Sequence, residues 1–115
     1  KLCVNQGLGV VAAGVGESLR LGRELDLDRA SLLDVLGATV YGFFVGQKRP
    51  MLDAGDFSET TFSLDLMAKD LDLAITASQS DLAVTRACLE LARAALDAGR
   101  AGQDYAAMTA HAEQG

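Results

Sequence analysis

Tryptophan is missing from this chain of 115 residues, which also has one histidine, one proline and two cysteines. The cysteines, Cys3 and Cys88, lie far apart and outside any Cys-x-x-Cys motif, and His111 has no second histidine to pair with. Neither a disulfide framework nor a metal site is therefore indicated. Cysteines of this kind are typical of the reducing cytoplasm, where we expect the protein to act.

Long hydrophobic runs and an excess of basic residues are missing as well. The longest nearly apolar stretch, residues 8–16, is far shorter than the roughly 18 residues that a membrane span needs. Ten basic and sixteen acidic residues give a net charge of −6, which repels phosphate backbones and anionic lipids. We therefore expect neither nucleic acid nor a membrane as a partner.

The chain does have the apolar content that folding requires, because 50% of its residues are hydrophobic, and this excludes intrinsic disorder. A chain of this length suits one domain and hides roughly two thirds of its unfolded surface. Alternating strand patterns, Asn-Gly hairpins and a strand-helix-strand rhythm do not occur. The sequence therefore predicts an all-α bundle of about four or five helices around one core.

Helical periodicity is clearest over residues 2–24. The larger apolar residues recur there every three or four positions, as on one helical face: Val4, Leu8, Val11, Val15 and Leu19. Four glycines lie in the same segment: Gly7, Gly9, Gly14 and Gly16. A glycine costs about 1 kcal/mol relative to alanine in a helix interior, so we expect close packing against another helix to retain them.

The next part of the chain is less regular. A second helix is expected over about residues 29–38, with Asp28 as its N-cap. Residues 38–44 fit either a helix or an extended segment, because periodicity cannot decide over so few positions. Residues 46–59 form the expected loop, since a Gly- and Pro-containing segment with Pro50 interrupts the pattern.

Two further helices are expected in the second half. Residues 61–79 carry two apolar stripes, so this helix should be central, and Ser58 or Thr60 should start it. Asp81 is the expected cap of the last long helix, and Asp104 the cap of a frayed tail helix.

One motif suggests a different fold. Residues 7–12 spell Gly-x-Gly-x-x-Ala after the apolar run 2–4, with Asp26 about twenty residues on, as in dinucleotide-binding folds. Such a turn needs a buried strand before it and a second strand that ends in the acid. Three apolar residues and a helical pattern stand there instead, so packed helices are the preferred interpretation.

A few polar residues could carry chemistry. Lys1 and Asn5 stand four positions apart, so on a helix they share a face and can bind one small polar ligand. Lys69 and Asp70 interrupt the most apolar helix, which indicates a salt-bridge anchor, the wall of a site or a solvated helix rim. Phe62 lies near enough to form an aromatic wall beside Asp70, although a core position explains this residue as well.

Several segments, taken in order, match one pattern. Residues 1–5 (KLCVN) are similar to a KxxxN segment, and residues 17–22 (ESLRLG) to an EALxLA helix. Residues 50–57 (PMLDAGDF) are similar to a PxMLxGDF loop, and residues 62–74 (FSLDLMAKDLDLA) to an FxLxLMxKDLxLA helix. Together they resemble the β-hydroxyacid dehydrogenases, the group that includes 3-hydroxyisobutyrate dehydrogenase, tartronate semialdehyde reductase and glyoxylate/succinic semialdehyde reductases.

This resemblance implies a fold and an activity. Residues 1–115 would be the all-helical C-terminal substrate and dimerisation domain of a 6-phosphogluconate dehydrogenase-like protein. An N-terminal Rossmann domain, which this chain does not include, would bind NAD or NADP. The whole protein would interconvert a 3-hydroxyacid and its semialdehyde by hydride transfer, and the chain alone should be inactive.

The resemblance also implies roles for individual residues. Lys1 would be the catalytic general acid and base, while Asn5 and Phe62 would bind the substrate. Lys69 and Asp70 would lie against the cofactor, with Asp70 orienting neighbouring groups.

The chain departs from the family pattern at a few positions. Gln6 replaces a frequent second asparagine beside the binding face, Glu24 replaces a turn glycine, and Thr85 stands where many members have proline. A homodimer is expected through the glycine-rich face of the first helix. Two alternatives remain open: a non-catalytic helical dimerisation module, and an isolated bundle that binds a small molecule.

Overall fold

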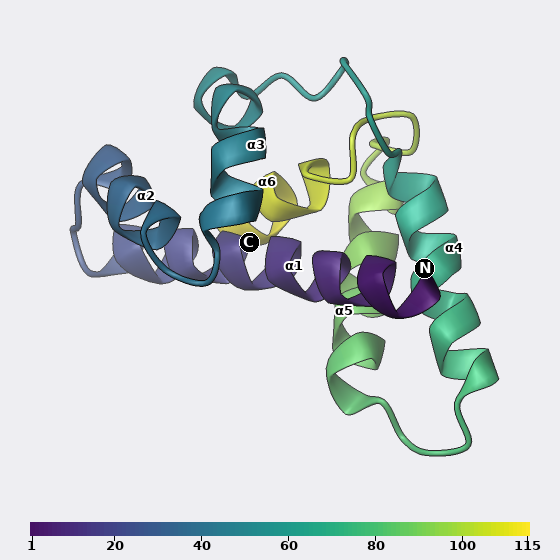
Figure 1. Ribbon diagram of the computed structural model, residues 1–115. Coiled ribbons are helices and arrows are strands. Elements are labelled where there is room, and N and C mark those ends of the chain that lie inside the picture. The colour runs from purple at the N-terminus through teal and green to yellow at the C-terminus, as the bar shows by residue number, and fades with distance from the viewer.

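The computed structural model describes residues 1–115 and confirms the all-α class (Figure 1). It has six helices, more than the sequence predicts. Their bounds are α1 (Leu2–Glu24), α2 (Arg29–Gly37), α3 (Gly42–Ala54), α4 (Leu64–Ala77), α5 (Ala83–Asp97) and α6 (Ala107–Gln114). None of these helices combines the length and the apolar character that crossing a membrane requires.

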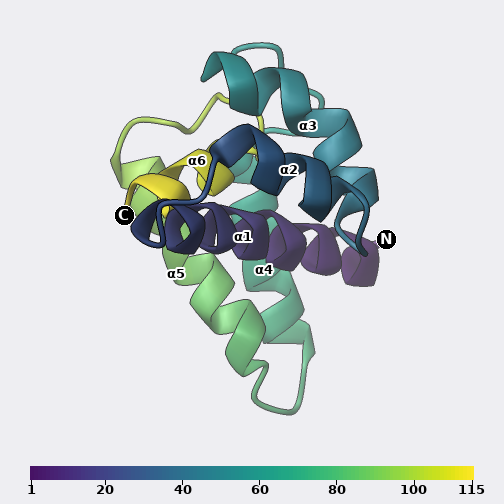
Figure 2. The ribbon, with the colours of Figure 1, turned by 90° about the vertical axis from the view of Figure 1, so that its left-hand side faces the viewer.

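Helix α1 is the element against which the others pack. The α4–α5 hairpin crosses its N-terminal half, α2 and α3 lie at its C-terminal half, and α6 packs against its middle (Figure 1). Figure 2 shows α2 and α3 on one side of α1 and the α4–α5 hairpin on the other. The N-terminal end of α1 therefore lies beside α4. Helix α2 lies at the opposite end of α1.

The glycines of α1 explain how closely its neighbours approach. A Cβ atom on Gly16 would lie 2.5 Å from the Thr109 carbonyl oxygen of α6, and one on Gly9 would lie 3.0 Å from the Met67 sulfur of α4. Gly7, in contrast, has nothing within 4 Å of such an atom. The expected close helix packing is thus confirmed at Gly9 and Gly16, and these contacts lie within the chain.

The second helix begins as predicted. The Asp28 side chain accepts a hydrogen bond from Ser31 N over 3.0 Å, and α2 follows from Arg29. This cap satisfies one of the backbone N–H groups that the first turn of a helix leaves free.

The predicted loop over residues 46–59 is wrong, because α3 continues through Pro50 to Ala54. Proline costs about 3 kcal/mol in a helix interior. The buried face of α3 offsets that cost, and its residues are Phe44, Val45, Lys48 and Leu52. The helix ends at Gly55, which adopts a left-handed φ of 65°. The ambiguous segment 38–44 divides into a turn and the start of α3.

The start predicted for the next helix, at Ser58 or Thr60, is wrong as well. Helix α4 begins at Leu64, because the segment before it pairs with the chain that follows α5. Tyr105 N donates to the Phe62 carbonyl oxygen over 2.8 Å. This bond occupies the Phe62 carbonyl oxygen, which in a helix that starts earlier would accept from the backbone N–H four residues on.

Helix α4 is also less central than predicted. Only one of its two apolar stripes is buried: Leu64, Met67, Leu71 and Ala74. Leu66 and Leu73 on the other stripe are each 46% exposed. The helix therefore has one face in the core and one apolar face open on the surface.

The two predicted caps in the second half are corrected by the structure. Asp81 forms an ion pair with Arg86, and Leu82 is the N-cap of α5. Asp104 is completely buried and α6 starts three residues later, at Ala107. The tail helix is not frayed, since most of its first turns are buried against α1.

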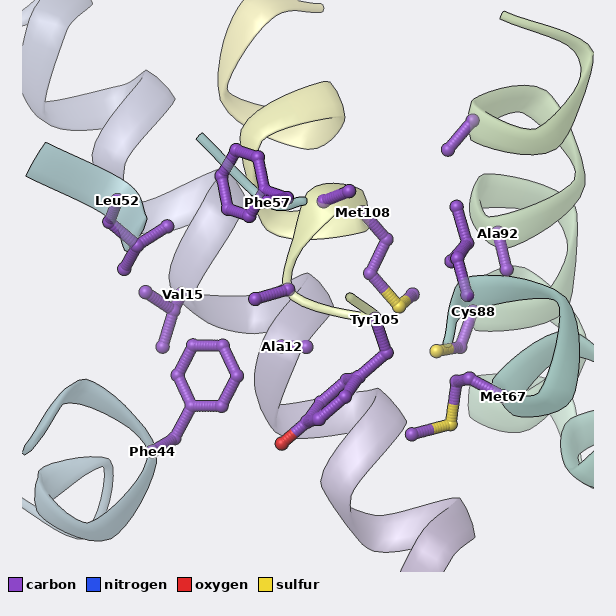
Figure 3. Packing of buried hydrophobic residues seen from close by; sticks show 14 of the residues in the cluster. Ala12, Val15, Phe44, Leu52, Phe57, Met67, Cys88, Ala92, Tyr105 and Met108 are labelled. Atoms are coloured by element: carbon purple, nitrogen blue, oxygen red, sulfur yellow. The ribbon is translucent and has the colours of Figure 1, made fainter. Parts of the chain in front are cut away.

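The core takes residues from all six helices, and an aromatic cluster lies within it. Figure 3 shows Tyr105 near its centre, beside Met67 and Phe44. The Tyr105 ring lies 6.0 Å from the Phe44 ring and 6.1 Å from the Phe62 ring, measured between ring centroids. Burial, reinforced by the charge of Asp104, raises the pKa of Tyr105 to about 12.

A buried ion pair lies beside this cluster. Lys48 Nζ contacts Asp104 Oδ2 over 3.0 Å and lies 4.8 Å from the centre of the Tyr105 ring. Asp104 also accepts hydrogen bonds from Thr61 N and Ala106 N. Burial alone would raise the pKa of Asp104, but these hydrogen bonds and the Lys48 ammonium outweigh it and lower the pKa. The pair thus ties α3 to the segments that precede α4 and α6.

Candidate functional site

Helices α1 and α4 bring two of the predicted site residues together. Asn5 Nδ2 donates a hydrogen bond to Asp70 Oδ2 over 2.7 Å, although the residues are 65 positions apart in the sequence. Both side chains are half-buried. The apolar period of each helix explains this contact. Helices α1 and α4 both turn their apolar faces to the core, and Asn5 and Asp70 stand at the edges of these faces.

The chemistry of this hydrogen bond fixes how Asn5 is oriented. An ionised carboxylate only accepts hydrogen bonds, so the amide nitrogen of Asn5 must face Asp70. The side-chain carbonyl oxygen of Asn5, Oδ1, has no hydrogen-bond partner within the chain. It is therefore free to accept a hydrogen bond from a ligand hydroxyl or an ammonium group.

Two exposed lysines accompany this pair, one four residues before Asn5 and one directly before Asp70. Lys1 is the N-cap of α1, and its carbonyl oxygen accepts a hydrogen bond from Asn5 N over 3.0 Å. Lys69 precedes Asp70 on α4. Neither lysine takes part in a salt bridge of the chain. Both ammonium groups are therefore available to an anionic or polar ligand.

Phe62 lies in the segment just before α4 and makes no contact with the Asn5–Asp70 hydrogen bond. Its half-buried ring packs against Tyr105. The structure thus groups Asn5 with Asp70, leaves Lys1 and Lys69 exposed on the same two helices, and puts Phe62 at the edge of the aromatic cluster.

Exposed apolar residues stand close to the polar pair on the same two helices. Val4, beside Asn5 on α1, is 64% exposed. Leu66 and Leu73 stand four residues before and three residues after Asp70, so they share its side of α4. A polar centre with an apolar rim that nothing in the chain covers is typical of a surface that another domain or a ligand completes.

Sequence reasoning did not find one contact near this site. Gln6 Nε2 donates to Thr85 Oγ1 over 2.9 Å, which links α1 to α5 across 79 positions. No motif signals such a pair, since its members belong to different helices.

No group of three or more His, Cys, Asp or Glu side chains is placed to hold a metal ion.

Comparison with known proteins gives one positive result. A family model described as NAD-binding of NADP-dependent 3-hydroxyisobutyrate dehydrogenase matches residues 1–112. No curated protein sequence matches the chain.

Proposed function

The chain belongs to the family of NAD-binding domains of NADP-dependent 3-hydroxyisobutyrate dehydrogenase, and from this we propose the function of the whole protein. We propose that the chain is the C-terminal helical domain of an NAD(P)-dependent oxidoreductase that interconverts a 3-hydroxyacid and its semialdehyde. The single observation that supports this most directly is the Asn5–Asp70 hydrogen bond, because it prepares a hydroxyl-binding group next to an exposed lysine.

Each residue of the site has a role in this proposal. Lys1 donates a proton to the carbonyl oxygen in the reductive direction and removes it from the hydroxyl in the oxidative direction. Asn5 binds the hydroxyl or carboxylate oxygen of the substrate through its side-chain amide, since one N–H of this amide donates to Asp70 and the second N–H is left to donate to the substrate. Asp70 holds the Asn5 amide in the orientation that this requires. Phe62 closes the apolar side of the pocket once substrate is bound.

The cofactor of the proposal is NAD or NADP, which supplies the site that accepts or donates the hydride. Residues present on α4 fit such a group, because Lys69 is an exposed ammonium that no carboxylate of the chain neutralises. Lys69 would bind a polar or anionic group of the dinucleotide, while Asp70 stays engaged with Asn5. Most of the binding surface would belong to an N-terminal Rossmann domain, which would cover the apolar rim formed by Val4, Leu66 and Leu73.

The direct test is a spectrophotometric screen of the intact protein for dinucleotide reduction that depends on a hydroxyacid. Lys1→Ala should lower kcat about 100-fold to 10,000-fold, because it removes the proton donor. Asp70→Asn should lower kcat about tenfold, because the Asn5 amide is no longer held in one orientation. Asp72→Asn is the matched control, since this exposed residue of α4 pairs only with Arg93. No activity with any hydroxyacid, or equal effects of the two aspartate variants, would refute the assignment.

The proposal also covers the oligomeric state of the protein and the compartment in which it acts. A homodimer is supported by the exposed apolar side chains near the end of α1 and on α2: Leu21, Leu25, Leu27 and Val35. Light scattering should show a dimer that Leu25→Glu weakens, whereas a monomeric wild type would reject it. The exposed free thiol of Cys3 fits the reducing cytoplasm, where we place the reaction.

A further inference from the structure

The first turns of α1 carry a second hydrogen bond between helices, on another side of the helix from Asn5. Gln6 Nε2 donates to Thr85 Oγ1, which joins α1 to α5. Consecutive residues of a helix point about 100° apart around its axis. Gln6 therefore does not share the direction of Lys1 and Asn5, although it follows Asn5 directly in the sequence.

Burial makes this contact costly to lose. Thr85 is 2% exposed, and the bond from Gln6 is the hydrogen bond that its hydroxyl makes. A buried hydroxyl without a partner destabilises the folded state, so the two residues depend on each other.

The bond depends on the length of one side chain and the hydroxyl of the other. An asparagine at position 6 would be one methylene shorter than Gln6, and a valine at position 85 would have no hydroxyl to accept the hydrogen bond. A change at either position should therefore break the same link between α1 and α5.

We propose that Gln6 is a positioning residue and not a ligand of the substrate, and that it anchors the first turns of α1 to α5 through Thr85. This inference rests on the proposed function, because it concerns the face of α1 that carries Lys1 and Asn5. Asn5 holds α1 to α4, and Gln6 holds it to α5. These two hydrogen bonds point in different directions, so together they fix the rotation of α1 about its axis. In that rotation the Asn5 amide contacts the hydroxyacid and the Gln6 amide does not.

The kinetic test compares Gln6→Asn, Thr85→Val and the double variant in the intact protein. Each single variant should lower kcat about two- to tenfold with KM unchanged, and the double variant should be no worse than either. Thr109→Val is the matched control, because Thr109 is equally buried and donates to the Ala12 carbonyl oxygen of α1 over 2.8 Å, farther along the helix. It should lower stability and leave kcat unchanged.

A second readout does not need activity. The side-chain amide resonance of Asn5 in an NMR spectrum should move in Thr85→Val and stay in place in Thr109→Val. Three results would overturn the inference. The Asn5 resonance could stay in place in Thr85→Val, or the effects of the two single variants on kcat could add up in the double variant. The third is a raised KM in Gln6→Asn while Thr85→Val leaves both kcat and KM unchanged. An inactive wild type would instead reject the proposed function, and the Asn5 resonance would still decide whether Gln6 positions α1.

Discussion

Replacing Lys48 by methionine tests the buried ion pair that holds α3 to the segments before α4 and α6. The variant keeps a long apolar side chain but leaves the completely buried Asp104 without its cation. Removing one partner of a buried pair costs about 3–5 kcal/mol, because the other charge stays buried without compensation. A domain of this size has a free energy of unfolding of about 5–15 kcal/mol, so the loss is a large share of it.

Urea unfolding followed by circular dichroism measures this loss. With a slope of about 2 kcal/mol per M, the midpoint should fall by about 2 M at pH 7. The control is Arg49→Met, which removes the same charge from the neighbouring residue. Arg49 pairs with the exposed carboxylates of Asp34 and Asp53, so solvent compensates for most of its loss. A Lys48→Met variant that is no less stable than Arg49→Met would refute the reasoning.

The pH dependence supplies a second check on the same pair. The pKa of Asp104 is lowered from its ordinary value of 3.8, so its contribution to stability is complete above that pH and is lost as the pH falls further. Without Lys48 the pKa of Asp104 is higher than in the wild type, because the hydrogen bond and the charge of Lys48 both lower it, so the variant neutralises this carboxyl at a higher pH. The difference in stability between wild type and Lys48→Met should therefore be largest at pH 7 and shrink on acidification.

Further predictions concern glycines and thiols. Gly16→Ala should cost about 1–3 kcal/mol of unfolding free energy, because its new methyl group would meet the Thr109 carbonyl oxygen. Gly7→Ala should instead stabilise the protein by about 1 kcal/mol in the same urea titration, since nothing lies near its Cβ position. Cys3 should react with iodoacetamide at pH 8 at least tenfold faster than Cys88, because burial raises the pKa of the Cys88 thiol to about 11. Equal alkylation rates of the native protein, read by mass spectrometry, would contradict that assignment.

The sequence predicts the helices best where local signals agree with burial. Residues 2–24 have an apolar period and form α1 as expected, and Asp28 caps α2. Prediction failed where distant contacts override local preference. Pro50 suggests a loop, but the buried face of α3 outweighs its cost, and pairing with the segment around Tyr105 delays the start of α4.

The candidate site shows the same division. The spacing of Lys1 and Asn5 predicts that they share a helix face, and the interruption of an apolar helix draws attention to Asp70. The partner of Asp70 could not be predicted from spacing, because it belongs to another helix. The burial of Asp104 could not be predicted either, since a local pattern makes it a surface cap.

The sequence by itself determined the all-α class, the period of each helix face and the kind of polar residue that stands at its edge, because these depend on neighbours within a few positions. Only the tertiary structure decided that Asn5 meets Asp70, that Gln6 meets Thr85, and that Lys48 is buried against Asp104. Such pairings depend on the angles at which helices cross, and these angles follow from packing the whole core at once.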